Sequence, residues 1–191
     1  MNPVERQEIL GLAEYEKIRG PFRARVIEEK KRRRVALGPR VTALFENHDT
    51  VLLQVQEMLR TERISREAAV QHEIDTYNQL VPAPGELSAT FMVEIPDAAE
   101  REAFLSSAAG LERHLWLVVD GRRVRASVEP SRVLPDRASA VMYAKFALPP
   151  EASTAVRTGR AALRLEADHP AYTATATITP EVAACLAEDM A

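Results

Sequence analysis

The segment of residues 45–63, FENHDTVLLQVQEMLRTER, constrains the fold most, because a β-like run gives way there to a strongly amphipathic helix. At about 100° per residue, one stripe of this helix collects five apolar side chains: Val51, Leu52, Val55, Met58 and Leu59. Asp49 or Thr50 is expected to cap the helix, since a short side-chain oxygen accepts from unpaired backbone N–H groups. We therefore expect Leu52, Val55 and Leu59 to be buried between the other N-terminal helices and a β-rich half.

The polar side of the same helix is a candidate interaction surface. Gln54, Glu57 and Arg60 lie off the apolar stripe, and residues three or four apart on a helix can support one another. Glu57 is expected to be solvated there. Glu62 projects near the centre of the apolar stripe, which allows two interpretations. Either the helix is frayed and exposed to solvent at this end, or Glu62 is a partly buried carboxylate that needs a cation or a metal.

Breakers divide the chain on both sides of this helix. Residues 10–18 predict a short helix that ends at Gly20, with Pro21 as the first residue of the next helix. Two apolar runs near 35–45 flank a Gly-Pro pair, which predicts a strand, a turn and a strand. A further helix is expected to begin at Ser65.

The Pro/Gly segment of residues 82–85 marks a change of pattern. Residues 1–81 predict a helical subdomain with a short β segment near 35–45, whereas residues 86–191 predict a β-rich subdomain with a hairpin at Asp120-Gly121. Six strands are expected in this half, with short helices between them: 87–95, 115–119, 124–128, 140–147, 163–167 and 172–178. The predicted class is α+β, with N-terminal helices packed on a mostly antiparallel sheet or sandwich of six or more strands, in one cooperative unit.

Composition excludes several classes of function. A net charge of −3 gives no overall attraction to nucleic acid or to an anionic membrane. Cys185 is the only cysteine, which excludes an intramolecular disulfide and a cysteine-built zinc or iron–sulfur site. No apolar segment reaches the ~20 residues of a membrane span, and the charged N-terminus is unlike a signal peptide. We expect a cytoplasmic protein.

No motif identifies a reaction, since the glycines form no phosphate-binding loop and no nucleophile-elbow or H-E-x-x-H motif occurs. His169 lies in the corner of residues 168–172, whose aspartate and tyrosine could orient its imidazole. A metal or acid–base site built from His169 or His48 with Glu46, Glu57 or Glu62 is chemically sensible, because imidazole and carboxylate suit iron or zinc. A structural loop histidine is the alternative.

Residues 30–34, KKRRR, form a basic run at the end of an expected helix. The helix dipole accounts for cations at that end. The run could contact phosphate, but it lacks the aromatic residues on which single-strand binders stack bases. Nucleic acid is therefore not the expected partner.

Several segments together resemble a bacterial family of unknown function: LAEYEKIR, FRARVIEEKKRRRVALGP, LFENHDTVLLQVQEMLRTERI, YNQLVPAPGELSAT and DHPAY. The resemblance covers nearly the whole chain. It implies a gene neighbourhood with rubrerythrin-like di-iron proteins and iron–sulfur oxidoreductases, and hence a redox or stress-response setting. It implies no activity and no iron site in this chain.

Two hypotheses of function follow. The first is an accessory or interaction protein without its own redox cofactor, which serves an iron–sulfur or di-iron redox partner. The second is a mononuclear metal-binding protein or enzyme that uses the His48, His169, Glu57 and Glu62 side chains as ligands.

Overall fold

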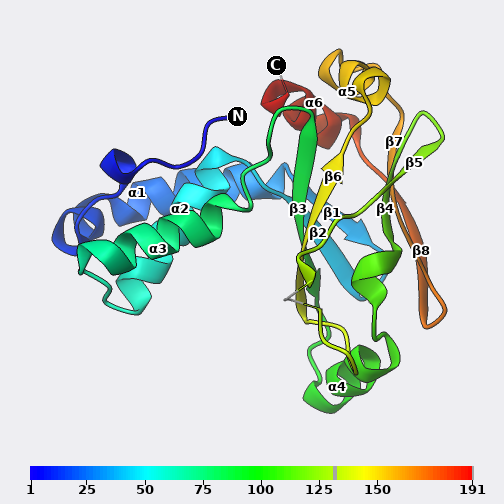
Figure 1. Cartoon of the computed structure of the whole chain (residues 1–191), viewed down its shortest axis with the longest axis horizontal. Coiled ribbons are helices and arrows are strands. Elements are labelled where there is room, and N and C mark those ends of the chain that lie inside the picture. The colour runs from blue at the N-terminus through cyan, green and yellow to red at the C-terminus, as the bar shows by residue number, and fades with distance from the viewer. Residues whose placement is uncertain (131–132, 191) are drawn as a thin grey trace.

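Strand-forming residues from both halves of the chain combine into two four-stranded antiparallel sheets that pack face to face, with a helical arm extending from one side (Figure 1). The computed structural model describes residues 1–130 and 133–190. This arrangement confirms the predicted α+β class. Within the described residues, no helix has both the length and the apolar character needed to cross a membrane.

Sheet A has the strand order β1-β2-β3-β6, which corresponds to Arg34–Leu37, Val41–Phe45, Glu86–Val93 and Val141–Ala147. Sheet B has the order β5-β4-β7-β8, which corresponds to Arg122–Arg125, Leu115–Val119, Leu163–His169 and Tyr172–Thr177. The short β segment expected near 35–45 thus pairs directly with β3, in register from Val41↔Val93 to Phe45↔Ala89. Sheet A therefore joins the two predicted subdomains.

Helices occupy the arm and the ends of the sandwich. The arm contains a 3-10 turn η1 and three helices, α1 to α3: Arg6–Glu8, Leu12–Lys31, His48–Thr61 and Glu67–Asn78. The sandwich carries α4, the 3-10 turn η2, α5 and α6: Ala98–Ser107, Leu111–His114, Pro150–Arg157 and Pro180–Asp189. The arm lies on the side of sheet A, whereas the strands of sheet B form the opposite side of the molecule (Figure 1).

The expected break at Gly20 is wrong, because α1 continues through Pro21 to Lys31. Proline removes one helical hydrogen bond and normally kinks or ends a helix. Ion pairs to α2 hold the helix on both sides of this point: Arg19 Nε lies 2.7 Å from Glu57 Oε1, and Arg25 pairs with Asp49. These contacts between helices outweigh the local preference for a break.

The apolar stripe of α2 builds a core inside the arm, separate from the sandwich core. Leu59 is 2% exposed and packs in one cluster with Val4, Val70 and Ile74 from the neighbouring arm segments. Burial of Val55 and Leu59 is confirmed, but Leu52 is only partly buried. The expected location between helices and sheets is wrong, since the sandwich has its own core between its two sheets.

Asn47 caps α2, in place of the expected Asp49 or Thr50. The Asn47 side chain accepts from the Thr50 backbone N–H at 2.9 Å, and the Thr50 hydroxyl accepts from the Asn47 backbone N–H at 2.9 Å. This reciprocal pair satisfies two backbone donors, which makes it more effective than a single-residue cap.

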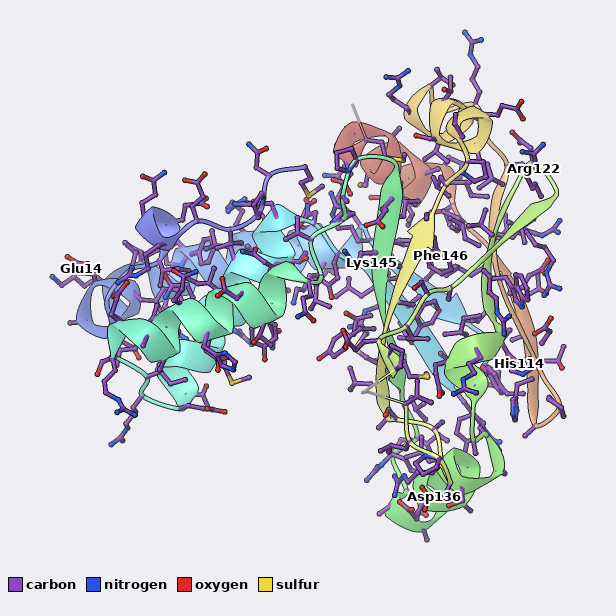
Figure 2. All side chains as sticks on the ribbon, in the orientation of Figure 1. Glu14, His114, Arg122, Asp136, Lys145 and Phe146 are labelled. Carbon is purple, nitrogen blue, oxygen red and sulfur yellow. The ribbon has the colours of Figure 1, made fainter. Side chains whose placement is uncertain are left out.

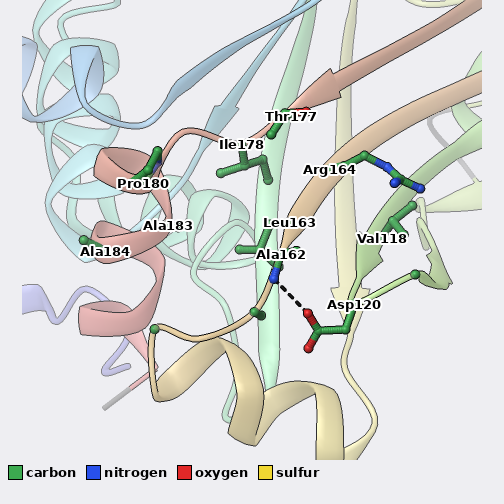
Figure 3. A pocket seen from close by; sticks show the side chains of 13 residues that line it. Val118, Asp120, Ala162, Leu163, Arg164, Thr177, Ile178, Pro180, Ala183 and Ala184 are labelled. Carbon is green, nitrogen blue, oxygen red and sulfur yellow. Dashed lines mark hydrogen bonds between the residues drawn. The ribbon is translucent and has the colours of Figure 1, made fainter.

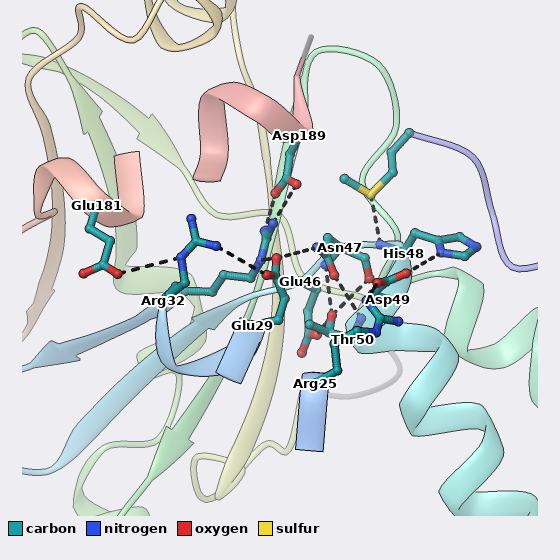
Figure 4. A network of polar contacts seen from close by, with 12 residues as sticks. Arg25, Glu29, Arg32, Glu46, Asn47, His48, Asp49, Thr50, Glu181 and Asp189 are labelled. Atoms are coloured by element: carbon teal, nitrogen blue, oxygen red, sulfur yellow. Dashed lines mark hydrogen bonds and ion pairs between the residues drawn. The ribbon is translucent and has the colours of Figure 1, made fainter. Parts of the chain in front are cut away.

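Arg33 connects the arm with the far end of the chain by pairing with Glu29 and Asp189, which Figure 4 labels. It follows α1, and its guanidinium is bonded on one side to Glu29 and on the other to Asp189 of α6, with Nη2 and Oδ1 2.9 Å apart. The Arg33 side chain is 3% exposed and that of Asp189 is 8% exposed. This buried pair fixes the root of the arm to the C-terminal helix.

Candidate interaction face

The tight hairpin between β4 and β5 determines which side chains share the outer face of sheet B. Asp120 and Gly121 both have positive φ, at 49° and 84°, as this two-residue turn requires. The resulting register places Trp116 opposite Arg125 and Val118 opposite Arg123. Because side chains alternate across a strand, these residues point away from the sandwich core.

The same two rows continue across β7 and β8. Trp116 pairs with Glu166, which pairs with Thr175, and Val118 pairs with Arg164, which pairs with Thr177. We call this surface the Trp116 face and define it by the outward residues Trp116, Val118, Arg123, Arg125, Arg164, Glu166, Asp168 and Thr175. Figure 2 shows His114 beside this sheet, at the opposite end of the molecule from Glu14 in the arm.

Trp116, the only tryptophan, is held in place by charged neighbours. The Arg123 guanidinium lies 4.1 Å from the centroid of the indole ring, and that of Arg125 lies 5.6 Å away. The indole Nε1 donates to Asp168 Oδ1 at 3.0 Å. Cation–π contacts and a satisfied N–H together fix the orientation of this half-buried ring, so the face contains a rigid aromatic group.

Asp168 is the acceptor that organises the polar part of the face. It accepts from Arg123 Nη2 at 2.6 Å and from Trp116, and it is 3.0 Å from His114 Nδ1. The hydrogen bond from Arg123, with smaller contributions from Trp116 and His114, lowers the pKa of Asp168 to about 2. Arg125 has no carboxylate partner among the described residues; it donates to the Arg113 carbonyl at 2.9 Å. The face therefore keeps a cation available for an acidic partner group.

A hollow of about 610 Å³ opens at one end of the Trp116 face (Figure 3). Val118 and Arg164 belong to the Trp116 face and also line the hollow. Apolar residues such as Ile178 and Ala183 form much of the rest of its wall. Asp120 lies at its edge and accepts from the Ala162 backbone N–H at 2.8 Å. An apolar hollow beside an aromatic and several arginines has the composition of a protein-binding hot spot.

The four predicted metal ligands lie in separate places. His169 is at the end of β7, where its Nε2 is 3.1 Å from the Ala109 carbonyl oxygen and its Nδ1 accepts from the Ala171 N–H. His48 begins α2 in the arm and contacts Glu8 and Asp49. No group of three or more His, Cys, Asp or Glu side chains that could hold a metal ion forms within residues 1–130 and 133–190.

The expected orientation of His169 by its neighbours is wrong. Asp168 points to the outer face and contacts His114, while the Tyr172 hydroxyl donates to the Leu37 carbonyl in sheet A. Successive residues of a strand point to opposite faces, so Asp168 cannot share a face with the imidazole of His169. Backbone groups hold both ring nitrogens, and the His114 ring packs edge-to-face on the imidazole with 5.1 Å between the centroids, which agrees with a structural histidine.

The polar side of α2 faces α1. Glu57 accepts from Tyr15 Oη at 2.7 Å and from Arg19 at 2.7 and 2.8 Å, and Arg60 pairs with Glu16. The hydrogen bond from Arg19, followed by that from Tyr15, lowers the pKa of Glu57 to about 2 against the effect of burial. Glu57 is therefore not the solvated residue that was expected.

The other two polar residues singled out on α2 have different surroundings. Gln54 lines a cavity of about 230 Å³ beside Glu46, at the junction of arm and sheet A. Glu62 is exposed at the C-terminal cap of α2, which is the wet helix end rather than a buried carboxylate.

The basic run 30–34 is largely engaged in ion pairs. Lys31 pairs with Glu28 at 2.7 Å, Arg34 with Glu94 at 3.1 Å, and Arg33 is buried between two carboxylates. Burial raises the pKa of the Cys185 thiol, which is 1% exposed and belongs to α6. Most cations of the run are thus engaged with carboxylates, and the Cys185 thiol is shielded from solvent.

The fold and its faces define a β-sandwich protein with a helical arm and with tryptophan and arginine side chains on the outer face of sheet B. The chain belongs to the family described as "Protein of unknown function (DUF3501)", whose model matches residues 3–190. It is also similar to a crystal structure of a novel protein of unknown function from Burkholderia pseudomallei K96243, with 36% sequence identity, a TM-score of 0.92 and 100% of both chains covered. No curated protein matches the chain.

Proposed function

We propose that this chain is an accessory protein that binds a partner protein through the Trp116 face and carries no redox cofactor of its own. The observation that supports it is the rigid placement of Trp116 between Arg123, Arg125 and Asp168 on an exposed sheet. Tryptophan and arginine are enriched among residues that dominate binding energy in protein interfaces. Antiparallel sheets commonly leave one face in water, and the outer face of sheet B is such a face.

The charges of the face favour a partner with acidic side chains. The outward residues include three arginines, at positions 123, 125 and 164, against the two carboxylates Glu166 and Asp168. Arg125 is the cation without a carboxylate partner in the described part of the chain. A partner carboxylate beside Arg125 and an apolar side chain in the hollow would complement both features.

The partner class that we propose is a redox protein of an iron–sulfur or di-iron system. A single cysteine, Cys185, cannot hold an iron–sulfur cluster, so electron-transfer groups would have to come from the partner. The gene neighbourhood that the sequence resemblance implies favours the same class.

Site-specific photo-crosslinking in the native host tests this proposal. A photoreactive amino acid replaces exposed Thr175 on the Trp116 face, and exposed Glu14 at the tip of the arm serves as the matched control position. We expect one acidic redox protein to be crosslinked from position 175 and not from position 14, and the two purified proteins to bind each other. Crosslinking from position 14 alone, or turnover of a substrate by the isolated chain, would refute the proposal.

A further inference from the structure

A second cavity, of about 280 Å³, lies between η2, the start of β6 and the segment that follows β5. Its walls are mostly apolar, with Val128, Val133 and Met142 among them. Three polar groups belong to this lining: the carboxylate of Glu112 and the hydroxyls of Ser139 and Tyr143. The cavity is distinct from the Trp116 face, because none of its lining residues belongs to that face.

Glu112 is the unusual member of this lining. It is 3% exposed, and neither carboxylate oxygen has a hydrogen-bond partner within residues 1–130 and 133–190. The other buried glutamate, Glu46, shows what a satisfied carboxylate looks like in this protein: at 7% exposure it accepts from the Thr50 and Thr90 hydroxyls at 2.5 Å each. A buried carboxylate without partners is strongly unfavourable, so Glu112 calls for a cation that the described residues do not supply.

We propose that this cavity binds a small organic ammonium ion, that is, a protonated primary amine with a short apolar body. The ammonium group would pair with Glu112 and donate to Ser139, while its carbon chain would contact Val128, Val133 and Met142. A metal ion fits less well, because one carboxylate and two neutral hydroxyls leave most of its coordination positions unfilled. The volume is at the low end for ligand sites, which restricts the ligand to a small molecule.

Binding of n-butylammonium and of 1-butanol to the purified full-length protein at pH 7 tests the proposal, since the two probes differ mainly in charge. The Met142 methyl resonance in NMR reports occupancy of the cavity. We expect n-butylammonium to shift this resonance saturably and to bind at least about 10-fold more tightly than 1-butanol, as a hydrogen bond to a charged group implies. Equal affinity for the two probes, or no binding of the amine, would overturn the proposal.

Glu112→Gln keeps the shape of the side chain and removes its charge, so it should abolish the preference for the amine over the alcohol. Glu14→Gln makes the same change on the exposed arm and should leave the preference intact. Should Glu112→Gln fail to fold, the comparison of the two probes on the wild-type protein decides alone. Arg132 lies outside the described residues but is next to Val133 in the sequence, so its cation is tested as well. If the amine binds to Arg132→Gln and not to the wild-type protein, the proposal is overturned.

Discussion

Replacing Arg33 by alanine is expected to lower the free energy of unfolding by about 3–5 kcal/mol, the usual loss when one member of a buried ion pair is removed. The Arg33 side chain is 3% exposed, and it alone neutralises Asp189, which is 8% exposed. Burial raises the pKa of Asp189, and Arg33 is the cation that opposes this effect. The loss would be a large share of the ~5–15 kcal/mol that holds a domain together.

The neighbouring arginine supplies a matched control. Arg34 pairs with Glu94 at 3.1 Å, but both side chains are about half exposed, at 47% and 48%. An exposed pair contributes at most about 1 kcal/mol, so Arg34→Ala should have a small effect. The comparison separates the burial of the pair from the loss of one positive charge.

Urea unfolding followed by two probes measures this change. Fluorescence of Trp116 reports on sheet B, whereas circular dichroism at helical wavelengths is dominated by the arm. If the chain is one cooperative unit, both transitions move together to lower urea in Arg33→Ala. A loss below about 1 kcal/mol, or an effect equal to that of Arg34→Ala, would refute the reasoning.

Three further predictions concern the arm and metal binding. Leu59→Ala should cost about 2–5 kcal/mol in urea unfolding because Leu59 is fully packed, and Leu52→Ala, which is partly exposed, should cost clearly less. Glu57→Gln should flatten the pH dependence of stability: the pKa of Glu57 is lowered to about 2, so its contribution, about 1–2 kcal/mol after screening, is present above pH ~4.5 and is lost as pH falls towards 2. Unchanged acid unfolding in this variant would contradict the Arg19–Glu57 contact. Elemental analysis after anaerobic loading of the untagged protein with iron, zinc or manganese should find well below one equivalent of metal. One full equivalent of bound metal would instead support the metal site built on His48 or His169.

Local signals in the sequence predicted the elements well where short-range chemistry determines them. The Asp120-Gly121 turn lies where it was expected, and the short helices between the strands begin at residues that favour a helix start: the Asp97 cap of α4, Pro150 of α5 and the Thr179 cap of α6. Each depends on a side chain or a backbone angle within a few residues. The α+β class follows from the same local patterns.

Long-range contacts could not be predicted from these patterns. α1 continues past Pro21 because ion pairs to α2 hold it, and the polar side of α2 is covered because Arg19 and Tyr15 reach Glu57. The pairing of β4 with β7 and of β3 with β6 likewise depends on packing between distant segments. Glu112 carries no signal in the sequence, since only the fold buries it.

The Trp116 face was missed although part of its signal was present. The two-residue Asp120-Gly121 turn fixes the register of the hairpin, which pairs Trp116 with Arg125 and Val118 with Arg123. Trp116 and Val118 are two residues apart on one strand, so Arg123 and Arg125 lie on the same face as Trp116. The positions of the strands alone do not show which side chains share a face; the register across the turn does. Asp168 could not have been added this way, because it comes from β7 through a crossover.

The affinity of the crosslinked partner for single-residue variants tests the central claim most directly. Trp116→Ala should weaken binding at least about 30-fold in isothermal titration calorimetry, the loss typical of a hot-spot residue, while Glu14→Ala at the far end of the arm should leave the affinity unchanged. Circular dichroism of each variant would confirm that the fold is intact. A partner that binds folded Trp116→Ala as tightly as the wild-type protein would show that the Trp116 face is not the binding surface.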